Sequence, residues 1–116
     1  MKQPILAAAA LVAAGCATIQ LPAEQLEQNK ATVRSAEELG AQQVPRARLH
    51  LQYAKDEEAW ARQLAQTGDD NAGLMLARSQ ADAELALALA REAQVHAQTL
   101  RTADDVNALR AKGGTP

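Results

Sequence analysis

The feature that most constrains the fold of this chain is a long segment without proline, residues 70–111. Proline breaks a helix interior because it lacks a backbone N–H and clashes with the preceding turn. Alanine, which has the highest intrinsic helix propensity, recurs throughout the segment. At a rise of about 1.5 Å per residue, a helix over this range would be about 60 Å long. We therefore predict one long C-terminal helix, followed by a disordered tail at residues 113–116.

Glycines and prolines divide the preceding chain into two further helices. We expect them over residues 22–39 and 45–67, because each range begins at a proline, which suits the first helical turn. Gly40 and Gly68 follow these ranges and suit the left-handed conformation that ends many helices. The short turn after Gly68 makes the second and third helices an antiparallel hairpin.

The expected fold is therefore all-α, with three helices in an up-down-up order, a shorter first helix and a long C-terminal helix. The helical domain would occupy residues 22–112, and Asp69 or Asp70 would cap the third helix. Beyond the N-terminal segment, β-branched residues almost never cluster, so no sheet is expected.

Apolar side chains at helical spacing indicate which faces close the hairpin. In the second helix the larger side chains form one stripe, while alanines and a leucine form a smaller second face. In the third helix one stripe stands out, although apolar residues cover much of the other sides as well. The second-helix stripe comprises Leu49, Tyr53, Trp60 and Leu64, its smaller face comprises Ala47, Leu51, Ala54, Ala61 and Ala65, and the third-helix stripe comprises Leu74, Ala77, Ala81, Leu85, Ala88 and Leu89.

Counting outward from the turn predicts which residues of the hairpin meet. The count pairs Trp60 with Ala77 and Leu64 with Leu74. We therefore expect Trp60 to be the largest side chain in the core, contributing about 3–5 kcal/mol if it is fully buried.

Four charged residues lie near the predicted seam of the hairpin: Lys55, Asp56, Arg78 and Asp82. The same count places Lys55 beside Asp82. One interpretation is ordinary salt bridges at the rim, worth about 0–1 kcal/mol each. The other is a polar set that fixes the register of the two helices. The first interpretation is favoured, and the second stays open.

Residues 1–15 have the three parts of a secretory signal. Lys2 supplies a positive start, residues 5–14 form an uncharged apolar run, and small residues lead up to Cys16. The run is shorter than the roughly 20 apolar residues that a membrane-spanning helix needs. As the only cysteine, Cys16 has no partner for an intramolecular disulfide or a thiolate zinc site.

The sequence around Cys16 resembles the bacterial lipoprotein box, with an alanine and a glycine directly before the cysteine. Ala13 departs from that pattern, since leucine is usual three places before the cysteine. The resemblance implies removal of the signal, lipid on Cys16, and a tether over residues 16–21. Ala17 stands where aspartate would mark retention in the inner membrane, so the resemblance implies the outer membrane and a protein that faces the periplasm.

A second resemblance covers roughly residues 31–97. The residues that carry it are Gly40, Ala41, Val44, Pro45, residues 47–54, Gly68, Asp69 and residues 81–93. These resemble a bacterial family, domain of unknown function 4398. Its members are short lipoproteins, and the same module precedes outer-membrane-protein-A-like domains in longer chains. The resemblance implies an alanine-rich helical hairpin and brings no established activity.

Composition and spacing argue against several classes of function. The whole chain carries a net charge of −2, and without residues 1–15 the balance is 11 − 14 = −3. Nucleic acids require a basic face, so they are not expected partners. His50 and His96, the only histidines, are expected at the surface or toward a partner. We assign no catalytic residue, cofactor or metal site, and expect no enzyme.

The end of the long helix has no expected neighbour within the chain. The second helix is long enough to cover the third only to about residue 92, and isolated helices of this length are marginal in water. Apolar residues nevertheless continue at near-helical spacing over residues 95–109, so we expect a second copy or an envelope partner to cover them. These residues are Val95, Leu100, Ala103, Val106 and Leu109.

Together these features favour a non-enzymatic envelope lipoprotein that acts as a membrane-anchored helical scaffold or adaptor. The alternative is a binding module for cell-wall polymer or for an outer-membrane-protein-A-like partner, which the companions of the resembled family suggest. A basic or aromatic groove would support the alternative.

Overall fold

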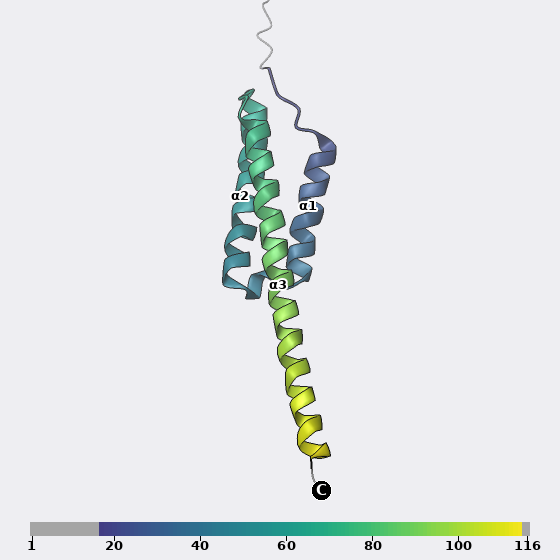
Figure 1. Cartoon of the computed structure of the whole chain (residues 1–116). Helices are drawn as coiled ribbons and strands as arrows, with labels where there is room; N and C mark the ends of the chain where they lie inside the picture. The colour runs from purple at the N-terminus through teal and green to yellow at the C-terminus, as the bar shows by residue number, and fades with distance from the viewer. Residues whose placement is uncertain (1–16, 115–116) are drawn as a thin grey trace, which may run out of the picture.

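The structure is a computed structural model, which describes residues 17–114. In that range the chain forms three α-helices: α1 over Ala23–Glu38, α2 over Pro45–Thr67 and α3 over Ala72–Gly113. One 3₁₀ turn, η1 at Ala41–Gln43, joins α1 to α2. Figure 1 shows α2 and α3 as an antiparallel pair, with α1 alongside α3 and the second half of α3 projecting beyond both. The all-α, up-down-up fold with a shorter first helix and a long last helix is confirmed.

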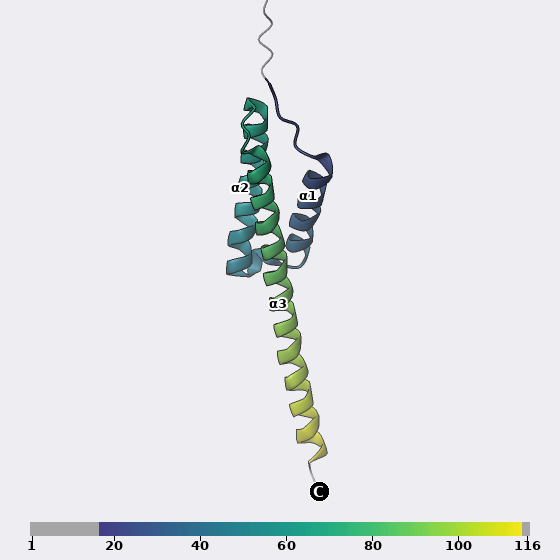
Figure 2. The same ribbon diagram turned by 45° about the horizontal axis from the view of Figure 1, so that its top comes forward.

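The predicted signal at residues 1–15, Cys16 and the last two residues lie outside the described residues. The first described segment runs along the end of α2, where the N–H of Ile19 donates to the carbonyl of Ala65 at 2.8 Å. The chain therefore enters the domain beside the turn between α2 and α3. α3 starts at that turn and carries the C-terminus to the opposite end of the molecule (Figure 2).

The two predicted helix stops are confirmed. Gly40 has φ 83° and Gly68 has φ 74°, both in the left-handed region that favours glycine. The predicted cap of α3 was wrong. Asn71 occupies the N-cap position without a side-chain hydrogen bond. The carboxylate of Asp69 instead accepts the N–H of Asn71 at 2.9 Å, which stabilises the turn itself.

The core consists mostly of alanine, in two clusters along α3. The cluster near η1 contains Leu51 of α2, and the cluster near the α2–α3 turn contains Met75 and Leu76 of α3. Leu51 and Leu76 are the largest apolar side chains that residues 17–114 bury completely. The buried alanines are Ala36, Ala41, Ala47, Ala54, Ala61, Ala65, Ala72, Ala83, Ala86 and Ala90.

The structure overturns the predicted packing of the hairpin. Trp60, expected in the core against Ala77, is 54% exposed, and Leu74 is 63% exposed instead of pairing with Leu64. Most of the larger stripe of α2 and most of the predicted stripe of α3 face solvent, whereas the small face of α2 is buried. Only Leu64 of the first stripe and Leu89 of the second are partly buried.

The reason for this reversal is the close approach of the three helices. The Ser79 hydroxyl of α3 reaches the backbone carbonyl of Ala54 in α2 at 2.6 Å, a contact that needs the two backbones close together. Alanine and serine permit that approach, whereas an indole ring between the helices would separate them. Because α1 also packs onto α3, each helix of the hairpin buries its small residues and turns its larger side chains outward.

Candidate interaction surfaces

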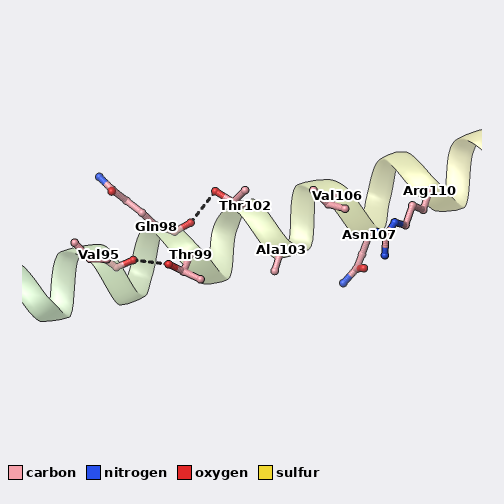
Figure 3. A pocket seen from close by; sticks show the side chains of 8 residues that line it. All are labelled: Val95, Gln98, Thr99, Thr102, Ala103, Val106, Asn107 and Arg110. Carbon is pink, nitrogen blue, oxygen red and sulfur yellow. Dashed lines mark hydrogen bonds between the residues drawn. The ribbon is translucent and has the colours of Figure 1, made fainter.

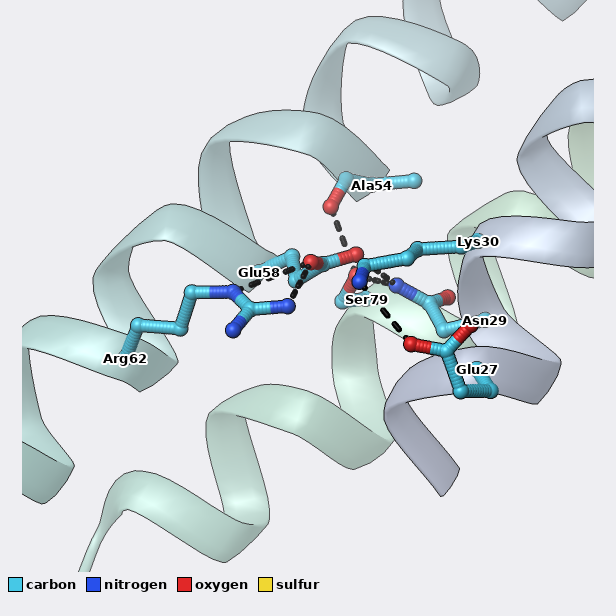
Figure 4. A network of polar contacts seen from close by, with 7 residues as sticks. All are labelled: Glu27, Asn29, Lys30, Ala54, Glu58, Arg62 and Ser79. Atoms are coloured by element: carbon cyan, nitrogen blue, oxygen red, sulfur yellow. Dashed lines mark hydrogen bonds and ion pairs between the residues drawn. The ribbon is translucent and has the colours of Figure 1, made fainter. Parts of the chain in front are cut away.

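A buried polar network joins all three helices (Figure 4). The amide of Asn29 in α1 donates to Glu58 of α2 at 2.8 Å and to Ser79 of α3 at 2.9 Å. Ser79 in turn donates to the carbonyl of Ala54. Arg62 holds the Glu58 carboxylate through two hydrogen bonds, of 2.7 and 3.1 Å. Asn29 and Ser79 are completely buried, so the network fixes the register of α1 against the hairpin.

The sequence pattern did not single out Asn29, although a signal was present. Asn29 lies three residues after Leu26 and four before Val33, and both of those residues pack into the core clusters. This spacing places Asn29 on the buried face of α1. A polar residue at such a position predicts a buried hydrogen-bond partner.

The four charges predicted near the seam divide into two pairs with different surroundings. Arg78 and Asp82 lie in the seam between α2 and α3. Lys55 was predicted beside Asp82, which is wrong, because it pairs with Glu37 of α1. Asp56 accepts a hydrogen bond from Gln52 on the exposed side of its own helix. A role of these four charges in setting the register stays a prediction.

The seam also contains two residues that the sequence did not place there. His50 lies 2.6 Å from Asp82, through Nδ1 and Oδ1, and both side chains are mostly buried. The expectation that His50 lies at the surface was therefore wrong, whereas His96 is exposed. Glu57 pairs with Arg78 at 3.2 Å, and its side chain is only 12% exposed. The seam thus brings two carboxylates, a histidine and an arginine together.

Burial raises the pKa of the Glu57 carboxyl above its ordinary value of 4.5. Hydrogen bonding to Asp82 and the negative charge of Asp82 raise it further, while the Arg78 guanidinium lowers it. The folded chain therefore holds this proton more tightly than the unfolded chain. The stability that protonated Glu57 contributes is fully present below pH 4.5 and is lost as the pH rises through the folded pKa.

Glu57→Gln is expected to raise the melting temperature at neutral pH, because it removes a buried charge and keeps a donor for Asp82. The gain should shrink as the pH falls toward 4.5, where Glu57 of the parent becomes neutral. Thermal melts followed by circular dichroism across this range measure the effect. Glu38→Gln, at an exposed position of α1, is the control and should follow the parent. A lower melting temperature for Glu57→Gln at neutral pH would show that its ion pair with Arg78 outweighs the burial.

The outward-turned side chains of the hairpin form a continuous apolar surface, which we call the outer face. Two residues along a helix correspond to a rotation of about 200°. Tyr53 therefore lies opposite Lys55, and Trp60 lies opposite Glu58; Lys55 and Glu58 are the residues through which α2 binds α1. The outer face thus lies on the side of the hairpin away from α1. It comprises Leu49, Tyr53 and Trp60 of α2 and Leu74, Ala77, Ala81, Leu85 and Ala88 of α3.

The second half of α3 extends beyond the other two helices, and we call residues 95–113 the extension. Gln94 makes the last described contact with another element, donating to the carbonyl of Leu39 at 3.3 Å. Every residue of the extension is exposed, as the sequence predicted. A shallow depression runs along one side of it (Figure 3). Its lining includes Val95, Thr99, Thr102, Ala103, Val106 and Arg110.

Neither the chemistry of residues 17–114 nor comparison with known proteins assigns an activity. Among these residues no group of three histidine, cysteine or acidic side chains could hold a metal ion. No helix in the described part of the chain is both long and apolar enough to cross a bilayer. Comparisons with protein-family models, characterised proteins and solved structures find no match to this chain. The resemblance to lipoproteins of the unknown-function family therefore stays a prediction.

Proposed function

We propose that this protein is an envelope lipoprotein that acts as a membrane-anchored helical scaffold or adaptor, facing the periplasm from the outer membrane. The observation that carries the proposal is the direction of the extension. The tether enters the domain at the α2–α3 turn, through the bond between Ile19 and Ala65. α3 leads from this turn to the far end of the molecule (Figure 1). A chain anchored through Cys16 would therefore hold the extension away from the membrane.

The lengths support a role as a spacer. α3 has 42 residues, which at about 1.5 Å per residue gives a helix of about 60 Å. The hairpin and α1 brace its first half, and the extension stands free along its second half. Such an arrangement presents an elongated helical surface to proteins in the envelope, at a fixed distance from the anchor.

The alternative proposal, a binding module for cell-wall polymer, gains one observation from the structure. Tyr53 and Trp60 expose about half of their surface on the outer face, and aromatic rings can stack on sugars. The same side chains serve a protein interface equally well. Cosedimentation with purified peptidoglycan separates the two, since only a wall-binding module would sediment with the polymer and lose that property in Trp60→Ala.

Cys16→Ser tests the anchor. The substitution is expected to abolish acyl labelling of the chain and to release it from membranes into the soluble fraction, because the thiol of Cys16 is the proposed attachment point. Metabolic labelling with a fatty acid, followed by fractionation of cells in high salt, measures both effects. Ser35→Ala is a matched control within the helical domain. If Cys16→Ser still sedimented with membranes in high salt, the anchor would lie elsewhere.

A further inference from the structure

We infer that the outer face and the extension form one interface, and that its occupant is a second copy of this chain lying parallel to the first. Exposed residues of α3 recur every seven positions across the whole length of the helix. One series comprises Leu74, Ala81, Ala88, Val95, Thr102 and Leu109, and the second, four residues later, comprises Arg78, Leu85, Glu92, Thr99 and Val106. This is the spacing of a coiled-coil seam.

The seam crosses from the hairpin to the extension without interruption. On a straight α-helix a seven-residue repeat drifts by about 20° per heptad, so two copies would wrap around each other in a left-handed supercoil. Arg78 and Glu92 are charged positions within it. Arg78 is already paired with Glu57, and Glu92 would lie beside Arg91 of the second copy.

The area available decides how much of the surface must take part. Residues 95–109 alone give a strip of about 20 by 10 Å, or about 200 Å². A stable interface needs about 800 Å² per partner. The full seam from Leu74 to Leu109 supplies about 500 Å², and the exposed halves of Tyr53 and Trp60 beside it add about 200 Å². The extension is therefore too small by itself, whereas the extension and the outer face together approach the required area.

Charge and anchoring both favour the parallel orientation. In a parallel coiled coil a residue just before the seam meets a residue five positions later on the second copy. This places Asp105 next to Arg110 of the second copy, and both side chains are exposed in the single chain. This orientation also rests on the proposed function, because two chains anchored in one membrane through Cys16 have their tethers at the same end. Since Thr99 and Thr102 make the middle of the extension polar, the high local concentration on a membrane would promote pairing.

Cysteine crosslinking in isolated envelopes tests the interface with the full chain. Ala81→Cys places a thiol in the seam on the hairpin, and Thr102→Cys places one in the seam on the extension. Ala97→Cys is the control, because Ala97 lies on the opposite side of the extension and is equally exposed. After mild oxidation, Ala81→Cys and Thr102→Cys are expected to give at least tenfold more disulfide-linked dimer than Ala97→Cys. In the parent, lipid on Cys16 should block the remaining thiol.

The possible failures are distinguishable. Equal dimer yields from Ala81→Cys and Ala97→Cys would overturn the inference, even if Thr102→Cys crosslinked. Capture of a different protein by Thr102→Cys would likewise overturn it in favour of an envelope partner. Dimerisation of the parent through Cys16 would instead contradict the proposed lipidation. In that case the same three variants in a Cys16→Ser background still test the seam.

Discussion

Leu76→Ala is expected to lower the free energy of unfolding by about 2–5 kcal/mol, the range for removing a buried leucine side chain. Leu76 is completely buried, in a cluster with Ala61 and Met75 and next to the partly buried Leu26 and Leu64. Most other buried side chains are alanines, which cannot move to fill the cavity left behind. A large share of the apolar burial near the hairpin turn is lost with this one side chain.

Urea unfolding followed by circular dichroism measures this loss. Leu74→Ala is a matched control on the same helix, and because Leu74 is exposed its cost should stay within about 0.5 kcal/mol. Trp60→Ala should also cost little in a dilute sample, for the same reason. A cost for Leu74→Ala or Trp60→Ala as large as that for Leu76→Ala would contradict the observed choice of buried faces.

Asn29→Asp is expected to cost about 3–5 kcal/mol at neutral pH, the range for an uncompensated buried charge. The substitution changes almost no volume, but it replaces the donor to Glu58 with a second carboxylate at a completely buried position. Two carboxylates at this distance cannot both stay ionised without a large cost. The expected loss therefore comes from the charge and the missing donor.

A double-mutant cycle isolates this effect. Adding Glu58→Gln to Asn29→Asp restores one donor and one acceptor across the α1–α2 contact, so the double variant should recover part of the stability. Asn107→Asp, on the exposed extension, is the control and should stay within about 0.5 kcal/mol of the parent. Additive losses in the double variant would mean that Asn29 and Glu58 do not interact.

The helix boundaries could be predicted from the sequence because local residues encode them. Pro45 begins α2, and the two glycines at its flanks adopt the expected left-handed conformation. Predicted and observed limits of α2 coincide, and those of α1 and α3 differ by one or two residues at each end. The free extension was also predicted correctly, because it follows from comparing the lengths of α2 and α3.

The buried faces and the seam contacts could not be predicted in the same way. Both faces of α2 have helical spacing, so periodicity alone could not choose between them, and the choice of the larger side chains was wrong. The polar network was missed because its members come from three helices. Asn29, Glu58 and Ser79 are far apart in the sequence and meet only when α1 packs against the hairpin.

The sequence by itself thus determined the number of helices, their ends, their order and the length of the unbraced extension. These properties depend on backbone preferences of a few residues and on the rise of a helix, which do not depend on packing partners. The tertiary structure alone decided which sides are buried. When three helices approach through alanine and serine, the gain from close packing and from buried hydrogen bonds exceeds the gain from burying Tyr53 and Trp60. Those larger side chains therefore remain on the surface, where they are available to a partner.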